Sequence, residues 1–169
     1  MSVDEQGVAT GICYGVDVGA ARVGVARSVS TLLPAMPVAT LTRDPEGNTD
    51  IHQLVQLMDE ETVHTVFVGL PLNLRGADTP STQAARDWAG LLAKTLAATG
   101  SATLVRLVDE RLSTVGASQK LQQAGRSAKK QRAVIDQQAA IEILQQALHM
   151  QESLQRAVGE LVDGRTEGH

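Results

Sequence analysis

The feature that most constrains the fold is a β-forming stretch that ends in a carboxylate and a glycine turn and then resumes as a second stretch. Residues 10–18 form the first stretch and residues 23–28 the second, and both are rich in Val and Ile or other β-formers. Gly19 lies between them, where the backbone must turn and a side chain would clash. The segment 10–28 therefore predicts a β-hairpin with Asp17 near the end of its first strand.

Asp17 shares a strand face with Cys13 and Gly15, while Val16 takes the other face, because side chains alternate along a strand. A lone carboxylate leaving a nearly apolar strand is costly to bury unless it is paired or binds a metal. The alternative is a turn aspartate that accepts hydrogen bonds from nearby backbone amides. The hairpin alone leaves both interpretations open.

The composition indicates one globular domain. The chain has 169 residues, of which 43% are apolar, enough for a real core. Its single cysteine, Cys13, excludes an internal disulfide and a cysteine-rich zinc site, and fits a reducing cytoplasm. The sequence shows neither a signal-peptide pattern nor a run of about 18 apolar residues. We therefore expect a cytoplasmic protein without a membrane span.

The charge distribution limits how nucleic acid could bind. The formal net charge is −4, which argues against coating of nucleic acid by bulk electrostatics. The aromatic residues are too few for a platform that stacks bases; they are Tyr14, Phe67 and Trp88. One stretch is purely basic and could hold phosphates beside a carboxylate site; its charges are Lys120, Arg126, Lys129, Lys130 and Arg132.

Apolar periodicity beyond the hairpin predicts alternating strands and helices. We expect strands at 37–41, 63–70 and 102–108, and helices at 48–61, 80–98, 113–123 and 127–158. A strand meander followed by this alternation predicts an α/β fold with a mixed sheet, antiparallel first and then parallel, and helices on both faces. We expect a flexible N-terminus (1–9), one domain (10–158) and a flexible C-terminal tail (159–169).

Three polar segments are expected to meet at one edge of this sheet. Right-handed crossovers would lay the first, fourth and fifth strands parallel and adjacent. Asp17, residues 69–71 and the pair Asp109–Glu110 all fall at the carboxyl ends of those strands. Ligands of such sheets bind beyond these ends. This convergence predicts a functional site.

A further acid, Asp136, lies in the apolar stripe of the last helix with Ala139, Ala140 and Ile143. It is too deep in the helix for stabilisation by the helix dipole, which is the alternative explanation. Asp109 and Glu110 are adjacent and would point to opposite faces of a strand, so both need not enter one site. An ordinary charged loop is the alternative for this pair.

These acids could gather into one carboxylate cluster of Asp17, Asp109 or Glu110, and Asp136. Like charges at close range need compensation, which a hard divalent cation such as Mg²⁺ or Mn²⁺ supplies. Two such ions about 3.5–4 Å apart would clamp a scissile phosphate, activate a water and stabilise the leaving oxygen. The four histidines match no motif, so no imidazole base is indicated.

Four ordered segments, 15–26, 68–73, 109–114 and 134–140, resemble the motifs of the YqgF family. These are RuvC-like nucleases, also called RuvX or Holliday-junction-resolvase-like proteins. The resemblance spans about residues 11–149 and implies an RNase H-like fold with a metal-dependent phosphodiesterase site. By matching positions, it implies Asp17, Glu110 and Asp136 as catalytic, metal-binding acids and Asp109 as a helper.

The resemblance also implies a function. Its members resemble endonucleases that process the 5′ end of precursor 16S rRNA in ribosome biogenesis, and some are treated as Holliday junction resolvases in DNA recombination and repair. The implied partners are structured RNA or branched DNA, and the implied cofactor is Mg²⁺ or Mn²⁺, as two ions. The chain could be a monomer or a homodimer; a resolvase is expected to be a dimer, because two strands must be cut.

Polar residues near the inferred edge could bind phosphates or orient the acids; they are Arg22, Asn73, Arg111, Ser113 and Thr114. Basic residues before Asp136 could guide the nucleic-acid backbone; they are Lys129, Lys130 and Arg132. Loop hydrogen bonding, helix capping and a solvated helix face are the alternatives. Gly116 stands where the family resemblance leads us to expect an acid, which affects peripheral contacts alone.

Two other classes of function remain open. The Asp-x-Gly hairpin also resembles the phosphate loop of actin-like ATPases and sugar kinases, but those enzymes close two such domains around a nucleotide and this chain has the length of one. A non-catalytic RNA-binding or assembly factor is the third interpretation, and the acidic net charge and scarce aromatics leave room for it.

Overall fold

The structure is a computed structural model that describes residues 8–30, 33–112 and 128–164, without the side chains of residue 112 and residues 128–134. Its elements follow in the order β1 (Ile12–Val18), β2 (Arg22–Ser28), β3 (Met36–Thr42), α1 (Thr49–Asp59), β4 (Val63–Leu70), α2 (Pro80–Ala98), β5 (Leu104–Asp109), the 3₁₀ turn η2 (Glu110–Leu112), α4 (Ala128–Leu154) and β6 (Glu160–Val162). The predicted strands and helices within the described ranges are present, with ends that differ by a few residues.

The strands form one mixed sheet in the order β3-β2-β1-β4-β5-β6. Strand β1 pairs antiparallel with β2 and parallel with β4, and β4 pairs parallel with β5. The meander β1–β2–β3 and the outer pair β5–β6 are antiparallel. The prediction that the first, fourth and fifth strands lie parallel and adjacent is confirmed.

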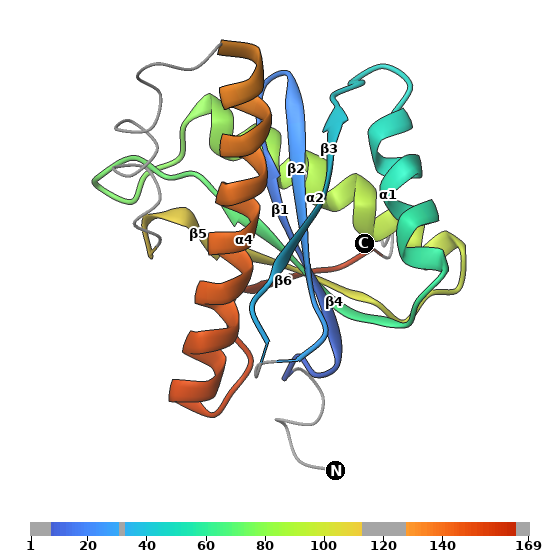
Figure 1. Ribbon diagram of the computed structural model, residues 1–169, viewed down its shortest axis with the longest axis vertical. Coiled ribbons are helices and arrows are strands. Elements are labelled where there is room, and N and C mark those ends of the chain that lie inside the picture. The colour runs from blue at the N-terminus through green and yellow to red at the C-terminus, as the bar shows by residue number, and fades with distance from the viewer. Residues whose placement is uncertain (1–7, 31–32, 113–127, 165–169) are drawn as a thin grey trace.

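Helices cover both faces of the sheet, as predicted. Helices α1 and α2 pack on one face and α4 crosses the other (Figure 1). The α1/α2 face buries Tyr14 and Val16 of β1, whereas the α4 face buries Cys13 of the same strand. Strand alternation therefore places Gly15 and Asp17 on the α4 side, which confirms the face expected from the sequence.

Helix α2 shows why its bounds were readable from the sequence. Thr79 caps its N-terminus by accepting a hydrogen bond from the Thr82 amide, and Pro80 occupies the first helical turn. Gly100, with φ +79°, follows its end. Such signals are local, so they do not depend on the rest of the fold.

Both ends of the domain extend further than predicted. The predicted C-terminal tail is wrong at Glu160–Val162, which pairs with β5 as strand β6. Three residues give too short a period to be recognised in the sequence. The predicted flexible N-terminus is wrong at Ala9, whose amide and carbonyl both hydrogen-bond the buried side-chain amide of Gln151 at 2.7 Å.

Two other expectations concern helices. The long predicted helix 127–158 ends earlier, at Leu154, and Gln155 follows with a φ of +56°. The predicted helix 113–123 lies outside the described residues. No helix within the described part of the chain combines the length and the apolar character needed to cross a membrane.

Candidate active site

Three carboxylates meet at the carboxyl edge of the parallel strands. Asp17 comes from β1, Glu110 directly follows β5, and Asp136 lies in α4. The carboxyl groups of Asp17 and Glu110 are hydrogen-bonded, and Asp136 is near enough for its charge to act on Asp17. The fold thus brings together the three acids that the sequence predicted as catalytic.

The electrostatics of this cluster are dominated by Asp17. Burial, followed by the charge and hydrogen bond of Glu110 and the charge of Asp136, raises the pKa of Asp17 well above its usual value. The hydrogen bond and the nearby charge of Glu110 both favour the protonated form of Asp17. A bound cation would compensate the charges of the neighbouring carboxylates.

Glycines opposite the acids allow this close approach. Gly24 of β2 is paired with Asp17, and a Cβ atom at Gly24 would lie 2.1 Å from the carbonyl oxygen of Asp136. A Cβ atom at Gly69 of β4 would lie 2.9 Å from Cγ of Glu110. Any side chain at these positions would displace helix α4 or Glu110.

A third glycine extends this contact along β1. A Cβ atom at Gly15 would lie 2.6 Å from the carbonyl oxygen of Ala140 in α4. Ala139 and Ala140 are both buried, as expected for a helix that lies directly on the sheet. Asp136, one turn before Ala140, is therefore fixed by backbone packing.

The structure separates the roles of the adjacent acids Asp109 and Glu110. Arg111 forms an ion pair with Asp109, with 2.6 Å between Nη2 and Oδ2, and its hydrogen bonds lower the pKa of Asp109. Val108 packs on the α4 face, so strand alternation returns Glu110 to that face. Glu110 joins Asp17, while Asp109 is held by Arg111.

Arg22 contacts the cluster directly. Its Nε atom lies 2.8 Å from Oδ2 of Asp136, and the two side chains are 32% and 15% exposed. Arg22 is thus paired with one of the three predicted catalytic acids. The turn that precedes Arg22 is closed by a 2.8 Å hydrogen bond from the Gly19 amide to the Arg22 carbonyl.

Of the remaining predicted polar residues, the structure describes the side chain of Asn73 alone. Asn73 organises its own loop, because its Oδ1 accepts hydrogen bonds from the amides of Arg75 and Ala77 at 2.9 Å. Ser113 and Thr114 lie outside the described residues. The basic residues predicted to guide the backbone lie on α4 within two turns before Asp136, and their side chains are not described; they are Lys129, Lys130 and Arg132.

Arg43 supports the site and was not predicted from the sequence. Its Nη1 donates a 2.8 Å hydrogen bond to the carbonyl oxygen of Gly19, in the turn that follows Asp17. Its Nε lies 3.7 Å from the buried carboxylate of Asp50, which also accepts a 3.0 Å hydrogen bond from Trp88. The available signal was Asp50, an acid beside Ile51 at the buried start of a helix.

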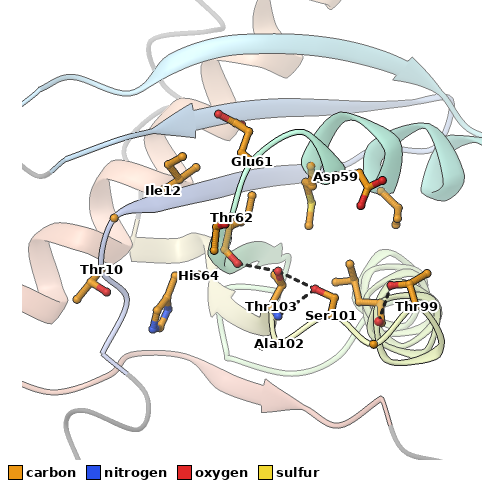
Figure 2. Close-up of a pocket in the computed structure, with 16 residues that line it drawn as sticks. Thr10, Ile12, Asp59, Glu61, Thr62, His64, Thr99, Ser101, Ala102 and Thr103 are labelled. Atoms are coloured by element: carbon orange, nitrogen blue, oxygen red, sulfur yellow. Dashed lines mark hydrogen bonds between the residues drawn. The ribbon is translucent and has the colours of Figure 1, made fainter.

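A larger cavity among the described residues lies away from the acids. It has a volume of about 560 Å³ and occupies the opposite end of β4 and β5, where Thr62, His64 and Ser101 line it (Figure 2). None of the three predicted catalytic acids lines it. A smaller cavity of about 280 Å³ does include Glu110 in its wall. Cavity size therefore does not locate the carboxylate site.

The carboxylate oxygens fit hard divalent cations such as Mg²⁺ or Mn²⁺ by their chemistry. In the ranges that the structure covers, however, no group of three His, Cys, Asp or Glu side chains is already arranged to hold an ion. Asp136 is turned toward Arg22, and Asp17 and Glu110 are turned toward each other. An ion would have to compete with Arg22 for Asp136 and with the contact between Asp17 and Glu110.

A mixed sheet with helices on both faces and carboxylates at the ends of its parallel strands defines a protein with an RNase H-like fold. Two solved structures share this fold. One, "T. thermophilus RuvC in complex with Holliday junction substrate", has a TM-score of 0.55 at 13% identity, covering 90% of this chain and 99% of that chain. A second Thermus thermophilus RuvC structure has a TM-score of 0.54 at 14% identity, covering 89% and 99%.

Sequence comparison identifies the family. The RuvX family, described as Holliday junction resolvase, matches residues 11–150. Relatives named "Putative pre-16S rRNA nuclease" include one from Clavibacter michiganensis subsp. michiganensis, 45% identical with 87% of this chain and 88% of the relative covered. Another, from Nocardioides sp., is 41% identical with 90% and 97% covered. The chain belongs to the RuvX family and is an enzyme of the nuclease class.

Proposed function

We propose that this chain is a metal-dependent endonuclease that hydrolyses phosphodiester bonds in processing the 5′ end of precursor 16S rRNA. The observation that carries the proposal is the hydrogen-bonded pair Asp17–Glu110 with Asp136 beside it. The names of the Clavibacter and Nocardioides relatives support RNA as the substrate. The role implies a cytoplasmic protein that acts in ribosome biogenesis, with one RNase H-like domain that extends from Ala9 to strand β6.

In this proposal Asp17, Glu110 and Asp136 hold the metal, as two Mg²⁺ or Mn²⁺ ions. Such ions, when bound, activate a water and stabilise the leaving oxygen of the phosphodiester. Arg22 orients Asp136 through their 2.8 Å ion pair. Asp109 acts as a helper that fixes Arg111 beside Glu110. Arg43 holds the turn after Asp17 through the Gly19 carbonyl.

Binding of the nucleic-acid backbone is assigned to basic and polar residues around this edge. Because the chain carries a net charge of −4, contacts with phosphates must be local. The proposed phosphate-binding residues are those already named: Arg22, Asn73, Arg111, Ser113, Thr114, Lys129, Lys130 and Arg132.

The direct test is Mg²⁺-dependent cleavage of a 5′-extended 16S rRNA precursor and of a four-way DNA junction by the purified protein. Asp17→Asn and Asp136→Asn should each abolish cleavage while leaving the fold intact. Asp59→Asn is the matched control, because Asp59 is an exposed acid that lines the cavity at the opposite end of the sheet. If neither substrate is cleaved and Asp17→Asn changes nothing, the nuclease function is wrong.

A Holliday junction resolvase is the second candidate. The description of the RuvX family as Holliday junction resolvase favours it, and so does the fold shared with a Thermus thermophilus RuvC that binds a Holliday junction substrate. A resolvase must cut two strands and is expected to act as a symmetric dimer. Paired cleavage of the junction by a dimer, measured together with sedimentation velocity, would favour this candidate. Cleavage of the RNA precursor by a monomer would favour the first.

A binding role without catalysis can be distinguished in cells. The RuvX match and the carboxylate cluster favour a nuclease over a binding factor and over an actin-like ATPase. If Asp136→Asn supports normal 16S rRNA maturation while Arg132→Glu does not, binding rather than cleavage is the function. The nuclease proposal predicts that Asp136→Asn fails.

A further inference from the structure

We propose that the cavity beside Glu110 binds one unstacked nucleobase of the substrate, next to the phosphodiester bond that is cut. The proposal rests on the proposed nuclease function. The cavity lies between β5 and the second half of α4 and is bordered by Val158 and Gly159. Its volume of about 280 Å³ is at the lower end of the roughly 300–1,000 Å³ of ligand pockets, which suits a single small ring system.

The position of the cavity links it to the acids. Glu110 is hydrogen-bonded to Asp17 and also lines the cavity. Gly69 brings Glu110 and Ile143 of α4 together, since a Cβ atom there would lie 2.9 Å from Cγ of Glu110 and 2.6 Å from Cδ1 of Ile143. Ile143 lines the cavity as well. A nucleotide whose phosphate meets the acids therefore has an apolar recess directly beside it.

The wall of the cavity matches the chemistry of a base. Its apolar part is formed by β5 and α4; these residues are Leu107, Val108, Ile143, Ala147 and Met150. The polarisable thioether of Met150 can pack against the face of a ring. Gln146 adds a half-buried amide that has no hydrogen bond with any described residue. That amide offers both donors and an acceptor to the polar edge of a base.

Charge favours a base over a phosphate in this recess. The carboxylates of Asp109 and Glu110 both line it, and the Asp109 charge is already matched by Arg111. Among the residues that the structure describes, no lysine or arginine lines it. An anion would meet carboxylates without a cation, whereas a neutral ring with amino groups would meet acceptors.

The aromatic residues of the chain offer no surface for stacking. They are one Tyr, one Phe and one Trp, and all three are buried in the two cores: Tyr14, Phe67 and Trp88. Proteins that hold single-stranded nucleic acid commonly stack bases on aromatic side chains. Among the described residues, the cavity lined by aliphatic side chains and the Met150 thioether offers a base a place away from water.

The test combines a substitution in the protein with the removal of single bases from the substrate. The probes are the 5′-extended 16S rRNA precursor stem and the four-way DNA junction, each with single abasic positions placed around the cleaved bond. We expect one abasic position to lower single-turnover kcat/KM by about tenfold, the lower end of what losing a stacked base costs. Met150→Ala should lower kcat/KM by about tenfold on intact substrate and remove the effect of that abasic position.

Two further variants make this result specific. Met150→Leu keeps the apolar wall and should restore most of the activity. Leu154→Ala is the matched control, because Leu154 is an exposed apolar residue on the last turn of α4 that does not line the cavity. It should behave as the unmodified protein, and thermal melts should confirm that all variants fold.

Several outcomes would overturn the proposal. In one, the abasic position lowers kcat/KM of Met150→Ala by the same factor as that of the unmodified protein. In another, Met150→Ala cleaves the intact substrate with the same kcat/KM as Leu154→Ala. A change in oligomeric state in Met150→Ala would show that the cavity belongs to a contact between copies of the chain. If the unmodified protein cleaves neither substrate, the nuclease function fails separately. In that case, binding of the intact and abasic substrates to the unmodified protein and to Met150→Ala is compared by fluorescence anisotropy without Mg²⁺. If the unmodified protein binds neither substrate, the base-pocket proposal is overturned as well.

Discussion

The two faces of the sheet are packed differently near the acids. The face toward α1 and α2 is filled by large side chains, with Val16 and Val25 of the sheet against Trp88 and Leu92 of α2. On the face toward α4, positions that touch the helix near the acids are glycines that admit no side chain. Near the acids, the α1/α2 face is therefore filled by apolar side chains, whereas on the α4 face the backbones of sheet and helix are in contact.

This difference has a chemical consequence. Gly24 pairs with Asp17 in the sheet and leaves room for the backbone of Asp136 to pack against β2. An acid of α4 is thereby brought beside an acid of β1. Side chains at these positions would hold the helix away from the sheet. On the α4 face, glycines near the acids leave out side-chain packing and so allow the carboxylates to lie close together. Substitutions on the two faces should therefore separate stability from activity.

The largest expected effect is that of Gly24→Ala. The new Cβ would lie 2.1 Å from the Asp136 carbonyl, so α4 must shift. We expect a stability loss of about 3 kcal/mol, the upper end for overpacking, and a loss of about 100-fold in cleavage from displaced acids. Denaturant unfolding and single-turnover cleavage measure the two effects. Gly90→Ala is the control, since nothing lies within 4 Å of a Cβ there; equal behaviour of the two variants would contradict the argument.

On the opposite face, Leu92→Ala should affect stability alone. Leu92 is fully buried in α2, and truncation of a buried leucine costs about 2–5 kcal/mol. The folded fraction should cleave at the unmodified rate, because Leu92 contacts the face away from the acids. Urea unfolding and cleavage at low temperature would check this. A defect in cleavage larger than the unfolded fraction explains would show that the two faces are not independent.

A smaller effect is expected from Arg22→Ala. Its ion pair with Asp136 is partly exposed, so stability should change by about 1 kcal/mol or less. Cleavage should fall by about tenfold, because partners that orient metal-binding side chains typically contribute 10–100-fold. Isothermal titration with Mn²⁺ and cleavage assays measure the change. Arg86→Ala, which removes an arginine paired with Glu160 far from the acids, should leave both unchanged.

The smallest expected effect is a pH dependence of stability that arises at the far end of the hairpin. Hydrogen bonds from Arg27 outweigh the opposing effect of burial and lower the pKa of Glu61 below its usual 4.5. Tyr14 also donates a 2.7 Å hydrogen bond to Glu61. A lowered carboxyl pKa stabilises the fold above about pH 4.5, and this stabilisation is lost as pH falls through the folded-state value.

Because this pair is partly exposed, its contribution should not exceed about 1 kcal/mol. Glu61→Gln should flatten the acid limb of thermal stability measured between pH 3 and pH 6, and leave cleavage at neutral pH unchanged. An unaltered acid limb would contradict the assignment. A loss of cleavage would show that this end of the hairpin influences the acids.

Local signals made much of this protein readable from its sequence. Asp17 could be recognised because it ends an apolar strand just before a glycine turn, and Asp136 because it interrupts an apolar helical stripe. Both lie in the observed cluster. The choice between Asp109 and Glu110 could not be made from spacing, because it depends on which face of β5 Val108 takes.

Contacts between residues far apart in the sequence could not be predicted in this way. Arg22 was expected to bind a phosphate or orient an acid, and its contact with Asp136 spans 114 positions of the chain. Gly15 and Gly69 carry no local sign of their role, since each is required by α4 or Glu110 arriving from elsewhere. Strand β6 was missed because three exposed or half-buried residues show no periodicity.

The sequence by itself determined the order of the described strands and helices up to α4, the alternation that puts Asp17 on one face, and the acids that can meet. Those properties follow from periodicity, turn residues and caps, which act over a few residues. The tertiary structure decided that Glu110 joins Asp17 while Asp109 turns to Arg111, that Arg22 holds Asp136, and that a cavity opens beside Glu110. These outcomes depend on how closely α4 lies on the sheet, and that distance is set by glycines on three different strands.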